Sequence, residues 1–554
     1  MKIQLSNDTF RFLRESDSYY IDKTGMLETY LNEKFEKAVL FARPRRFGKT
    51  ITMTMFRDFL DVRQDSKKIF DGLEIMKHKE TVEKYMNKYP VIFTSLKEVS
   101  GESFEAVLKN LKIMASKLYE EHIYLRDSQN VSDVSKISFE EILRQKSTTE
   151  DTIQALDHLS KMLKQHYNKP VFVIIDEYDV PMARTLNTPA YRQTREMIEK
   201  MLSYVCKTNE NVKGVILSGC LYTVKNSTYT GLNNIIPYTV LSPNYASSIG
   251  FTDNEVKKLL SDANISDRYE TVREWYDGYI FGREKMYCPW DVLRYVSSIL
   301  DGSYSEAMGP ESYWVNTSET SLDIIHGFLG KTPNANETFE KLLADKTIDC
   351  IVNENLTYHN IHSDGENIWS ALLETGYLTK AVTERMSLMP LKIPNRGIKN
   401  VFRHEVWDFF RDKLDNIFIE DLVNSLWSNE IKNAEKALNQ ILEATLSFYH
   451  EYHEYSYHLI LDGFFTGRGY QVLSETESGY GRSDLIIKDP ARNRCLILEL
   501  KHVKTKHGLT KTLSEASNQI IEQKYESALK YEGYNTIIKY AMVFCDKKSQ
   551  IKNA

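Results

Sequence analysis

The chain has 554 residues, 42% of them hydrophobic and 27% charged, so it is too long for one core and too apolar to be disordered throughout. No apolar run approaches the roughly 20 residues that span a bilayer, and the N-terminus lacks the apolar core of a secretory signal. The net charge of −6 gives no overall attraction to nucleic acid, and the six scattered cysteines form no CxxC pair or disulfide framework. We therefore expect two or three domains, no membrane association and a reducing, cytoplasmic setting.

Strand-like apolar runs alternate with helical stretches through residues 1–250. The runs are KAVLFA, YPVIFTSL, PVFVIIDEYD and VKGVILSG, and the helical stretch TMTMFRDFLDV follows the first of them. Strands rich in Val and Ile, separated by long helical segments, are typical of a parallel sheet flanked by helices. The predicted class is α/β, with a first domain over residues 1–250.

The rest of the chain divides into two regions of different character. Residues 251–440 have a mainly helical pattern with irregular connections such as AMGPESYWVNTSE. Residues 441–554 begin with a helix rich in Tyr and His and continue through the strands YQVLSETE, RSDLIIKD and RCLILELKH to a helix and a last strand. This αβββαβ order predicts a second α/β domain at the C-terminus.

The segment FARPRRFGKT ends a strand and begins a helix, as a P-loop does. Residues Arg46, Phe47, Gly48, Lys49 and Thr50 are the predicted ATP-binding segment. The lysine can reach the β- and γ-phosphates, the threonine hydroxyl can hold Mg²⁺, and the glycine lets the backbone approach the phosphates. The standard pattern has a glycine where this chain has an arginine, at the first position of the loop.

Two further strands end in polar residues that suit ATP hydrolysis. Asp176 is expected to position the Mg²⁺ shell, and Glu177 to orient and polarise the attacking water. Ser218, at the end of VKGVILSG, is expected to lie between the two motifs as a sensor. The alternatives are a helix N-cap for the Asp-Glu pair and a plain turn for the serine.

The chain resembles the AAA-ATPase-like family that is found beside a C-terminal PD-(D/E)XK nuclease domain. The resemblance rests on YYIDKTGMLETYL, RPRRFGKT, IIDEYDVP and SGCLYTVKNSTYTGLNN, and continues through WYDGYIFG, YWVNTSE, IWSALLETGYLT and LKIPNR over nearly the whole chain. It implies a P-loop NTPase sheet, ATP and Mg²⁺ as cofactors, and an arginine-rich loop as the usual form. Tyr222 replaces an arginine that the family carries after the sensor strand, while Lys225 is kept. Nucleotide binding is expected, and the efficiency of hydrolysis stays open.

A second constellation lies near the C-terminus, where Asp484 begins one strand and Glu499 and Lys501 lie on the next. Alternation along the strand puts the glutamate and the lysine on one face. The two carboxylates can hold Mg²⁺, and the lysine can activate the nucleophile or neutralise the transition state. The arrangement resembles the core of PD-(D/E)XK nucleases, although Ser483 stands where the motif has proline. The alternative is a solvated strand edge with an incidental salt bridge.

Secondary candidates surround this site. The helix from Gln519 to Tyr525 is similar to the glutamine-to-tyrosine motif of RecB-like nucleases, and Glu477 lies in a stretch that matches the family. Glu454 or His458, on the helix YHEYHEYSYH, could complete the metal site; the alternative is an aromatic core helix with polar residues toward solvent. A basic cluster follows, and it suits either a phosphate backbone or a plain solvated surface: Arg492, Arg494, Lys501, Lys504, Lys506 and Lys511.

These patterns predict an ATP-binding hydrolase with a Mg²⁺-dependent nuclease domain that acts on DNA or RNA. The alternative is an ATP-dependent switch or interaction protein whose nuclease-like domain is inactive or only binds nucleic acid. A third reading, a remodelling motor, needs a ring, for which Arg184, Arg192 and Arg195 are available as trans-acting fingers. The sequence does not distinguish DNA from RNA or exonuclease from endonuclease, and it leaves the oligomeric state and the biological role open.

Overall fold

The protein is described from a computed structural model that resolves most of the chain into two compact units. The described residues are 1–5, 9–33, 35–207, 209–222, 232–306, 309–314, 338, 341–343, 345–353, 356–358, 360–361, 366–381, 388–402, 416–445, 454–478, 481–523 and 526–554. Unit 1 comprises Met1–Tyr304, Pro310–Thr320 and Thr347–Gly397, and unit 2 comprises Ser305–Gly309, Ser321–Lys346 and Ile398–Ala554.

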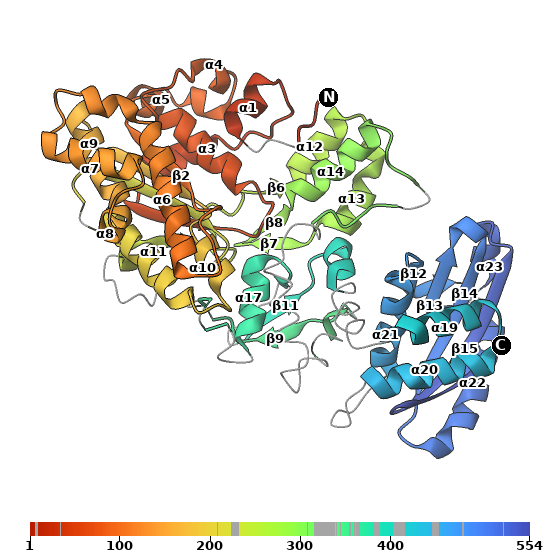
Figure 1. Cartoon of the computed structure of the whole chain (residues 1–554). Helices are drawn as coiled ribbons and strands as arrows, with labels where there is room; N and C mark the ends of the chain where they lie inside the picture. The colour runs from red at the N-terminus through yellow and green to blue at the C-terminus, as the bar shows by residue number, and fades with distance from the viewer. Residues whose placement is uncertain are drawn as a thin grey trace. The chain divides into compact units, whose positions relative to one another are not determined.

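Unit 1 is built on a five-stranded parallel sheet, of which Figure 1 labels strand β2. Its order is β2 (Val91–Ser95), β3 (Val171–Asp176), β4 (Val212–Gly219), β1 (Ala38–Ala42) and β5 (Ile236–Tyr238). Strands β1 and β3 are buried along their whole length, as strands covered on both faces are expected to be. The parallel α/β sheet predicted from the apolar runs is confirmed.

Helices connect and cover these strands. Helix α3 (Lys49–Leu60) packs on β2, β3 and β4, α9 (Ala155–Tyr167) packs on β2 and β3, and α11 (Tyr191–Cys206) packs on β4. The other helices of this part are α1 (Phe10–Glu15), α2 (Gly25–Glu28), α4 (Lys67–Phe70), α5 (Lys79–Tyr85), α6 (Phe104–Glu120), α7 (Asp133–Leu143), α8 (Thr149–Ile153) and α10 (Val180–Thr185).

The remainder of unit 1 is mainly helical, as predicted, but it also contains two small antiparallel sheets that the sequence patterns did not reveal. The helices are α12 (Asp253–Asp262), α13 (Tyr269–Tyr276), α14 (Pro289–Leu300) and α17 (Asn367–Thr375). One sheet has the order β6 (Phe251–Thr252), β8 (Glu284–Tyr287), β7 (Tyr279–Phe281), and the other β10 (Thr379–Lys380), β11 (Met389–Lys392), β9 (Ile348–Cys350). These strands are too short to carry a periodic signal.

Unit 2 contains the predicted C-terminal sheet, here five-stranded and mixed. Its order follows the chain: β12 (Gln471–Ser478), β13 (Gly481–Asp489), β14 (Arg494–His502), β15 (Thr536–Cys545) and β16 (Lys548–Asn553). Only β14 and β15 are parallel, joined through α22 (Leu509–Gln523) and α23 (Glu526–Tyr531). Helices α19 (Asn416–Trp427), α20 (Ile431–Thr445) and α21 (Glu454–Thr466) also belong to this unit.

A separate apolar layer covers each face of this sheet. Leu496, Leu498 and Leu500 join a core formed with α19, α20 and α21, whereas Cys495 and Ile497 join a core formed with α22. Because side chains alternate along a strand, every odd-numbered residue of β14 faces α22. The face on which a nuclease-type site would lie is therefore set by the hydrophobic pattern.

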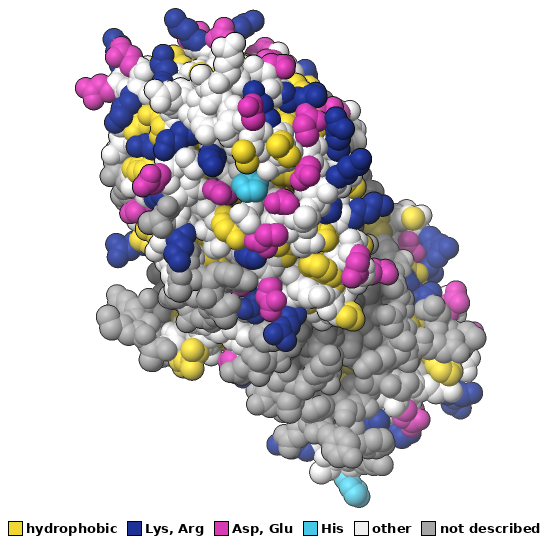
Figure 2. Space-filling view, turned by 60° about the vertical axis from the view of Figure 1, so that its left-hand side comes forward, with side chains coloured by type: hydrophobic (Ala, Val, Ile, Leu, Met, Phe, Trp, Pro, Cys, Tyr) yellow, Lys and Arg dark blue, Asp and Glu magenta, His cyan; other side chains and the backbone are white. Residues whose placement is uncertain are grey.

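The described surface carries charges of both signs. Figure 2 shows Lys and Arg side chains interspersed with Asp and Glu over the visible face. All six cysteines are free thiols. Among the described helices, none has both the length and the apolar character needed to cross a bilayer.

Candidate functional site

The loop between β1 and α3 has the backbone geometry of an anion-binding turn. Gly48 precedes the helix with φ 96°, and Arg46 also has a positive φ, 67°. No side chain caps the N-terminus of α3, so the amide groups of its first turn are available to an anion. A phosphate group is the ligand that such a helix start and loop accommodate.

Lys49 lies within this loop, folded back onto it. Its ammonium group donates to the carbonyl groups of Arg43 and Pro44, both at 3.0 Å, and lies 3.7 Å from the sulfur of Cys220. The side chain is only 8% exposed. The loop carbonyls thus satisfy a buried charge next to the turn where phosphate groups would be received.

The order of the strands brings the predicted hydrolytic residues together, because β4 lies between β1 and β3. The Thr50 hydroxyl donates to one carboxylate oxygen of Asp176 at 2.8 Å, and the hydroxyl of Ser218 donates to the other. A hydroxyl and a carboxylate in contact are the oxygen ligands that Mg²⁺ prefers. These residues fit the metal that the P-loop implies.

Glu177 follows directly, with φ 52°, in the left-handed region. Its amide donates to Asp176 at 3.1 Å and to Ser218 at 3.3 Å, which fixes the turn after β3. Burial raises the pKa of its carboxyl group, and the charge of Asp176 raises it further, while Lys49 and Lys97 act in the opposite direction. A carboxylate with a raised pKa is a better proton acceptor than one in water.

Asp179 is a structural member of the site that the sequence analysis did not single out. Its carboxylate is 2% exposed and accepts hydrogen bonds from the amides of Cys220 and Leu221 and from the hydroxyl of Tyr358, at 2.9, 3.1 and 3.1 Å. A β-carbon at Gly219 would lie 2.7 Å from this carboxylate. The aspartate therefore holds the segment after β4 against the turn after β3. The only sequence signal was its place in IIDEYD.

The loop between β1 and α3 is called the phosphate loop below. Its side chains point in different directions. Phe47 is 1% exposed and packs against Tyr279 and Phe281, so only its backbone is available to a nucleotide. Arg46 is exposed, and its guanidinium lies 4.2 Å from the ring centroid of Trp290. Arg43 is fully buried.

Two carbonyl groups of the loop are held by residues far along the chain. The indole of Trp314 donates to the carbonyl of Arg45 at 3.3 Å, and the thiol of Cys288 contacts the carbonyl of Arg46 at 3.7 Å. The N–H and C=O groups of a peptide unit point in opposite directions. Each contact therefore directs the amide of the same peptide unit away from Trp314 or Cys288.

Tyr222 takes no position suited to a phosphate ligand. It is 9% exposed, burial raises the pKa of its phenol, and its hydroxyl donates to the carbonyl of Ile235 at 3.5 Å. Lys225 lies outside the described residues. The described segment after β4 therefore presents a buried phenol where the resemblance implies an arginine.

The C-terminal site gathers its three predicted residues on one face of the sheet of unit 2. Lys501 lies 3.0 Å from Glu499 and 3.8 Å from Asp484, measured from the ammonium to the nearest carboxylate oxygen. The amide of Leu500 donates to Asp484 at 2.7 Å, which fixes this carboxylate against β14. Glu499 is fully buried, and Asp484 and Lys501 are about a quarter exposed, at 23% and 28%.

The carboxylates of Glu499 and Asp484 could hold a divalent cation, although the site has two such groups and not three. Within the described ranges, no group of three or more His, Cys, Asp or Glu side chains is arranged to hold a metal ion. Both carboxylates face the ammonium group of Lys501, so a single cationic group already lies within reach of the pair. The donor set fits Mg²⁺, which accepts one or two carboxylates and completes its shell with water and substrate phosphate.

Only some of the secondary candidates lie among the described residues. His458, on α21, donates through Nε2 to the carbonyl of Asp484 at 2.8 Å, so it supports the strand that carries this aspartate. Gln519 lies half-buried on α22, the backbone of Glu477 lies opposite that of Arg482 in the register of β12 and β13, and Glu454 begins α21. Tyr525 lies outside the described residues.

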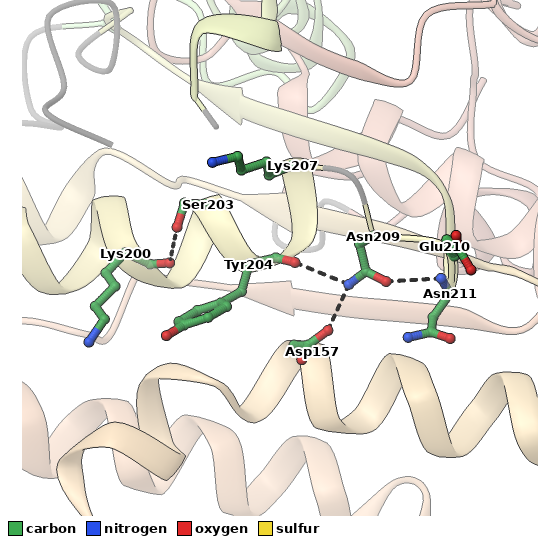
Figure 3. A pocket seen from close by; sticks show the side chains of 8 residues that line it. All are labelled: Asp157, Lys200, Ser203, Tyr204, Lys207, Asn209, Glu210 and Asn211. Carbon is green, nitrogen blue, oxygen red and sulfur yellow. Dashed lines mark hydrogen bonds between the residues drawn. The ribbon is translucent and has the colours of Figure 1, made fainter. Parts of the chain in front are cut away.

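A surface depression elsewhere in unit 1 has a different character. It has a volume of about 480 Å³ and lies beside the loop between α11 and β4 (Figure 3). Asn209 crosses it, donating to Asp157 at 2.7 Å and to the carbonyl of Tyr204 at 3.1 Å, and its own oxygen accepts from the amide of Asn211. These polar groups satisfy one another, which indicates a structural role for the asparagine.

Comparison with known proteins agrees with the two predicted domain families. Residues 5–229 match the family described as Predicted AAA-ATPase, and residues 452–554 match the PD-(D/E)XK nuclease superfamily. The chain thus combines an AAA-ATPase-like domain with a C-terminal PD-(D/E)XK nuclease superfamily domain, as the motifs predicted. It is also similar to an uncharacterized protein in the vnfD 5′ region of Azotobacter chroococcum mcd 1. The two are 23% identical over 407 residues, which is 72% of this chain and 68% of that protein.

Proposed function

We propose that the protein binds and hydrolyses ATP in unit 1 and cleaves phosphodiester bonds of nucleic acid in unit 2, with Mg²⁺ in both sites. The hydrogen bond from Thr50 to Asp176 carries the first part, because it joins the P-loop and the acidic strand at the place where a nucleotide-bound cation would be held. The contacts of Lys501 with two carboxylates carry the second part.

In unit 1 the chain's own groups would each make one contribution. Lys49 would leave its loop carbonyls and neutralise the β- and γ-phosphates, while the amides of the loop and of α3 receive their oxygens. Glu177 would accept a proton from the attacking water, and Ser218 would keep the Asp176 carboxylate in its present orientation. Mg²⁺, when bound, would neutralise the charge that develops on the phosphates.

In unit 2 the buried Glu499 and the partly exposed Asp484 would hold a cation on the α22 face. Lys501, released from one of the carboxylates, would orient the attacking water or neutralise charge on the scissile phosphate. Mg²⁺ at this site would supply the activated water. The basic side chains that follow β14 offer contacts to the nucleic acid backbone.

The test uses purified full-length protein with Mg²⁺ or Mn²⁺, single- and double-stranded DNA and RNA, with and without ATP. Lys49→Ala should abolish ATP binding, and Lys501→Ala should abolish cleavage. Matched controls are Lys37→Ala, at the opposite end of β1, and Lys488→Ala, on the neighbouring strand with an ion pair to Glu532 at 2.6 Å. Undiminished cleavage in Lys501→Ala would remove this site as the catalytic centre.

A second candidate is an ATP-dependent switch whose nuclease-like unit does not cleave. The buried phenol of Tyr222 favours it, because this side chain supplies no positive charge to the γ-phosphate. It predicts ATP binding that is lost in Lys49→Ala, with no cleavage under any metal or nucleotide condition. Stimulation of ATP hydrolysis by added DNA would count against it.

A further inference from the structure

We propose that Arg43 is a positioning residue for nucleotide binding, which braces the phosphate loop from behind at the place where the standard motif has a glycine. The inference rests on the proposed binding of ATP in unit 1 and assigns a task to the residue by which this loop departs from the motif. The arginine would make no contact with the nucleotide and would act through the backbone of the loop.

The side chain of Arg43 is fully buried and tied to three backbone carbonyl groups. One terminal nitrogen donates to Ala42 at 2.8 Å and to Tyr238 at 2.7 Å, and the other donates to Tyr245 at 2.8 Å. The guanidinium carbon lies 5.3 Å from the ring centroid of Phe281. The planar fork of an arginine suits several fixed acceptors at once.

The backbone of the same residue faces the phosphate site. The amide of Arg43 donates to Gly219, at the end of β4, at 3.1 Å, and its carbonyl accepts from the ammonium of Lys49 at 3.0 Å. Arg43 therefore joins the ends of β4 and β5 to the start of the loop, and its carbonyl helps to place the phosphate-binding lysine.

A glycine at this position would change the loop in two ways. The carbonyls of Tyr238 and Tyr245 would lose a charged donor in a buried setting, and the space of a guanidinium would open beside Phe281. The chain at residue 43 would also gain conformational freedom, which the loop would lose again on binding. Restoring the motif should therefore weaken nucleotide binding.

The experiment measures the affinity of the full chain for a fluorescent ATP analogue in the presence of Mg²⁺. The variants are Arg43→Gly, Arg43→Met and Arg43→Lys, each titrated well below its melting temperature. The matched control is Arg63→Met, which removes an arginine paired with the buried Asp61 at 2.7 Å, beyond the far end of α3. This control registers the effect of losing a buried ion pair without touching the loop.

We expect Arg43→Gly and Arg43→Met to weaken binding by about tenfold or more, since each loses hydrogen bonds of a charged donor. Arg43→Lys, which keeps one donor, should fall between them and the parent protein. Arg63→Met should lower the melting temperature and leave the affinity within about twofold. Parent-like affinity in Arg43→Gly would overturn the inference alone, whereas no ATP binding by the parent protein would overturn the proposed function and the inference with it.

Discussion

Asp291 offers a direct test of how burial changes the pKa of a carboxyl group next to the phosphate loop. It lies in the first turn of α14, is 4% exposed, and one of its oxygens has no hydrogen-bond partner among the described residues. Its carboxyl faces the Cys288 thiol and the guanidinium of Arg46. Its charge also contributes to the raised pKa of the phenols of Tyr276 and Tyr279. Burial raises its pKa to about 7, which the thiol and Arg46 only partly oppose.

The sign of the effect on stability follows from this shift. The native state binds the proton more tightly than the unfolded chain, where an aspartate titrates near 3.8. The contribution to stability is therefore complete below about pH 4 and is lost as the pH rises to about 7. Three pKa units correspond to about 4 kcal/mol, of which about 2–3 kcal/mol would be lost between pH 5 and 7.

Asp291→Asn removes the titration while keeping the shape of the side chain. The new amide brings N–H groups that need partners, at a cost of about 1–3 kcal/mol. We expect the unfolding free energy of the variant, relative to the parent, to rise by about 2–3 kcal/mol from pH 5 to pH 7 and then to level off. Thermal and urea unfolding of unit 1 across this range measure the difference.

The matched control is Asp301→Asn, just beyond the last turn of the same helix. Asp301 is exposed, and hydrogen bonds from Ser303 lower its pKa, so its contribution is present at neutral pH and lost only as the pH falls. The control should therefore show no gain in stability between pH 5 and 7. A flat difference for Asp291→Asn over the same interval would refute the assignment of this carboxyl as a buried acid.

Three further predictions concern other parts of the chain. Glu177→Gln should lower ATP hydrolysis by at least about a hundredfold and keep ATP binding. Hydrolysis by the parent should fall with decreasing pH through the raised pKa of this carboxyl, whereas rapid turnover in the variant would exclude the glutamate as the base. Gly278→Ala should destabilise unit 1 by about 2–4 kcal/mol in urea unfolding. A β-carbon there would lie 1.9 Å from a backbone carbonyl oxygen at φ +114°, whereas Gly302→Ala, with φ +75° and open space, should cost only the strain of a left-handed alanine, about 1–2 kcal/mol. Lys501→Met should lower the melting temperature of unit 2 by leaving a buried carboxylate without its cation, and Mg²⁺ or Mn²⁺ should restore it more than in Lys488→Met; equal effects of the metal would argue against a cation site.

The sequence predicted the parts of the molecule whose signals are local. The apolar runs ending in Asp176 and Ser218 marked parallel strands, and the alternation along β14 placed Glu499 and Lys501 on one face, as the structure has them. The geometry of Thr50 and Asp176 follows once the strand order is known. The functional roles of these residues stay predictions.

Long-range contacts were beyond the reach of the sequence. Two of the three acceptors of Arg43 lie 195 and 202 residues along the chain, so no spacing showed that this arginine is a buried brace rather than a phosphate ligand. The start of α14 was marked by a proline, but nothing indicated that its Trp290 and Asp291 face the phosphate loop. Burial of a charge depends on partners that only the folded chain brings together.

The anchors of the phosphate loop have a consequence for exchanging parts between related proteins. The match to the ATPase family ends at residue 229, yet Tyr238, Tyr245, Cys288 and Trp314, which hold the loop, all follow it. A hybrid that took residues 5–229 from a relative would combine the relative's loop with the anchor residues of this chain. The loop and its anchors would then be mismatched as hydrogen-bond partners. These four anchors all lie in unit 1, so an exchange between relatives should move the loop and its anchors together, by paired substitutions.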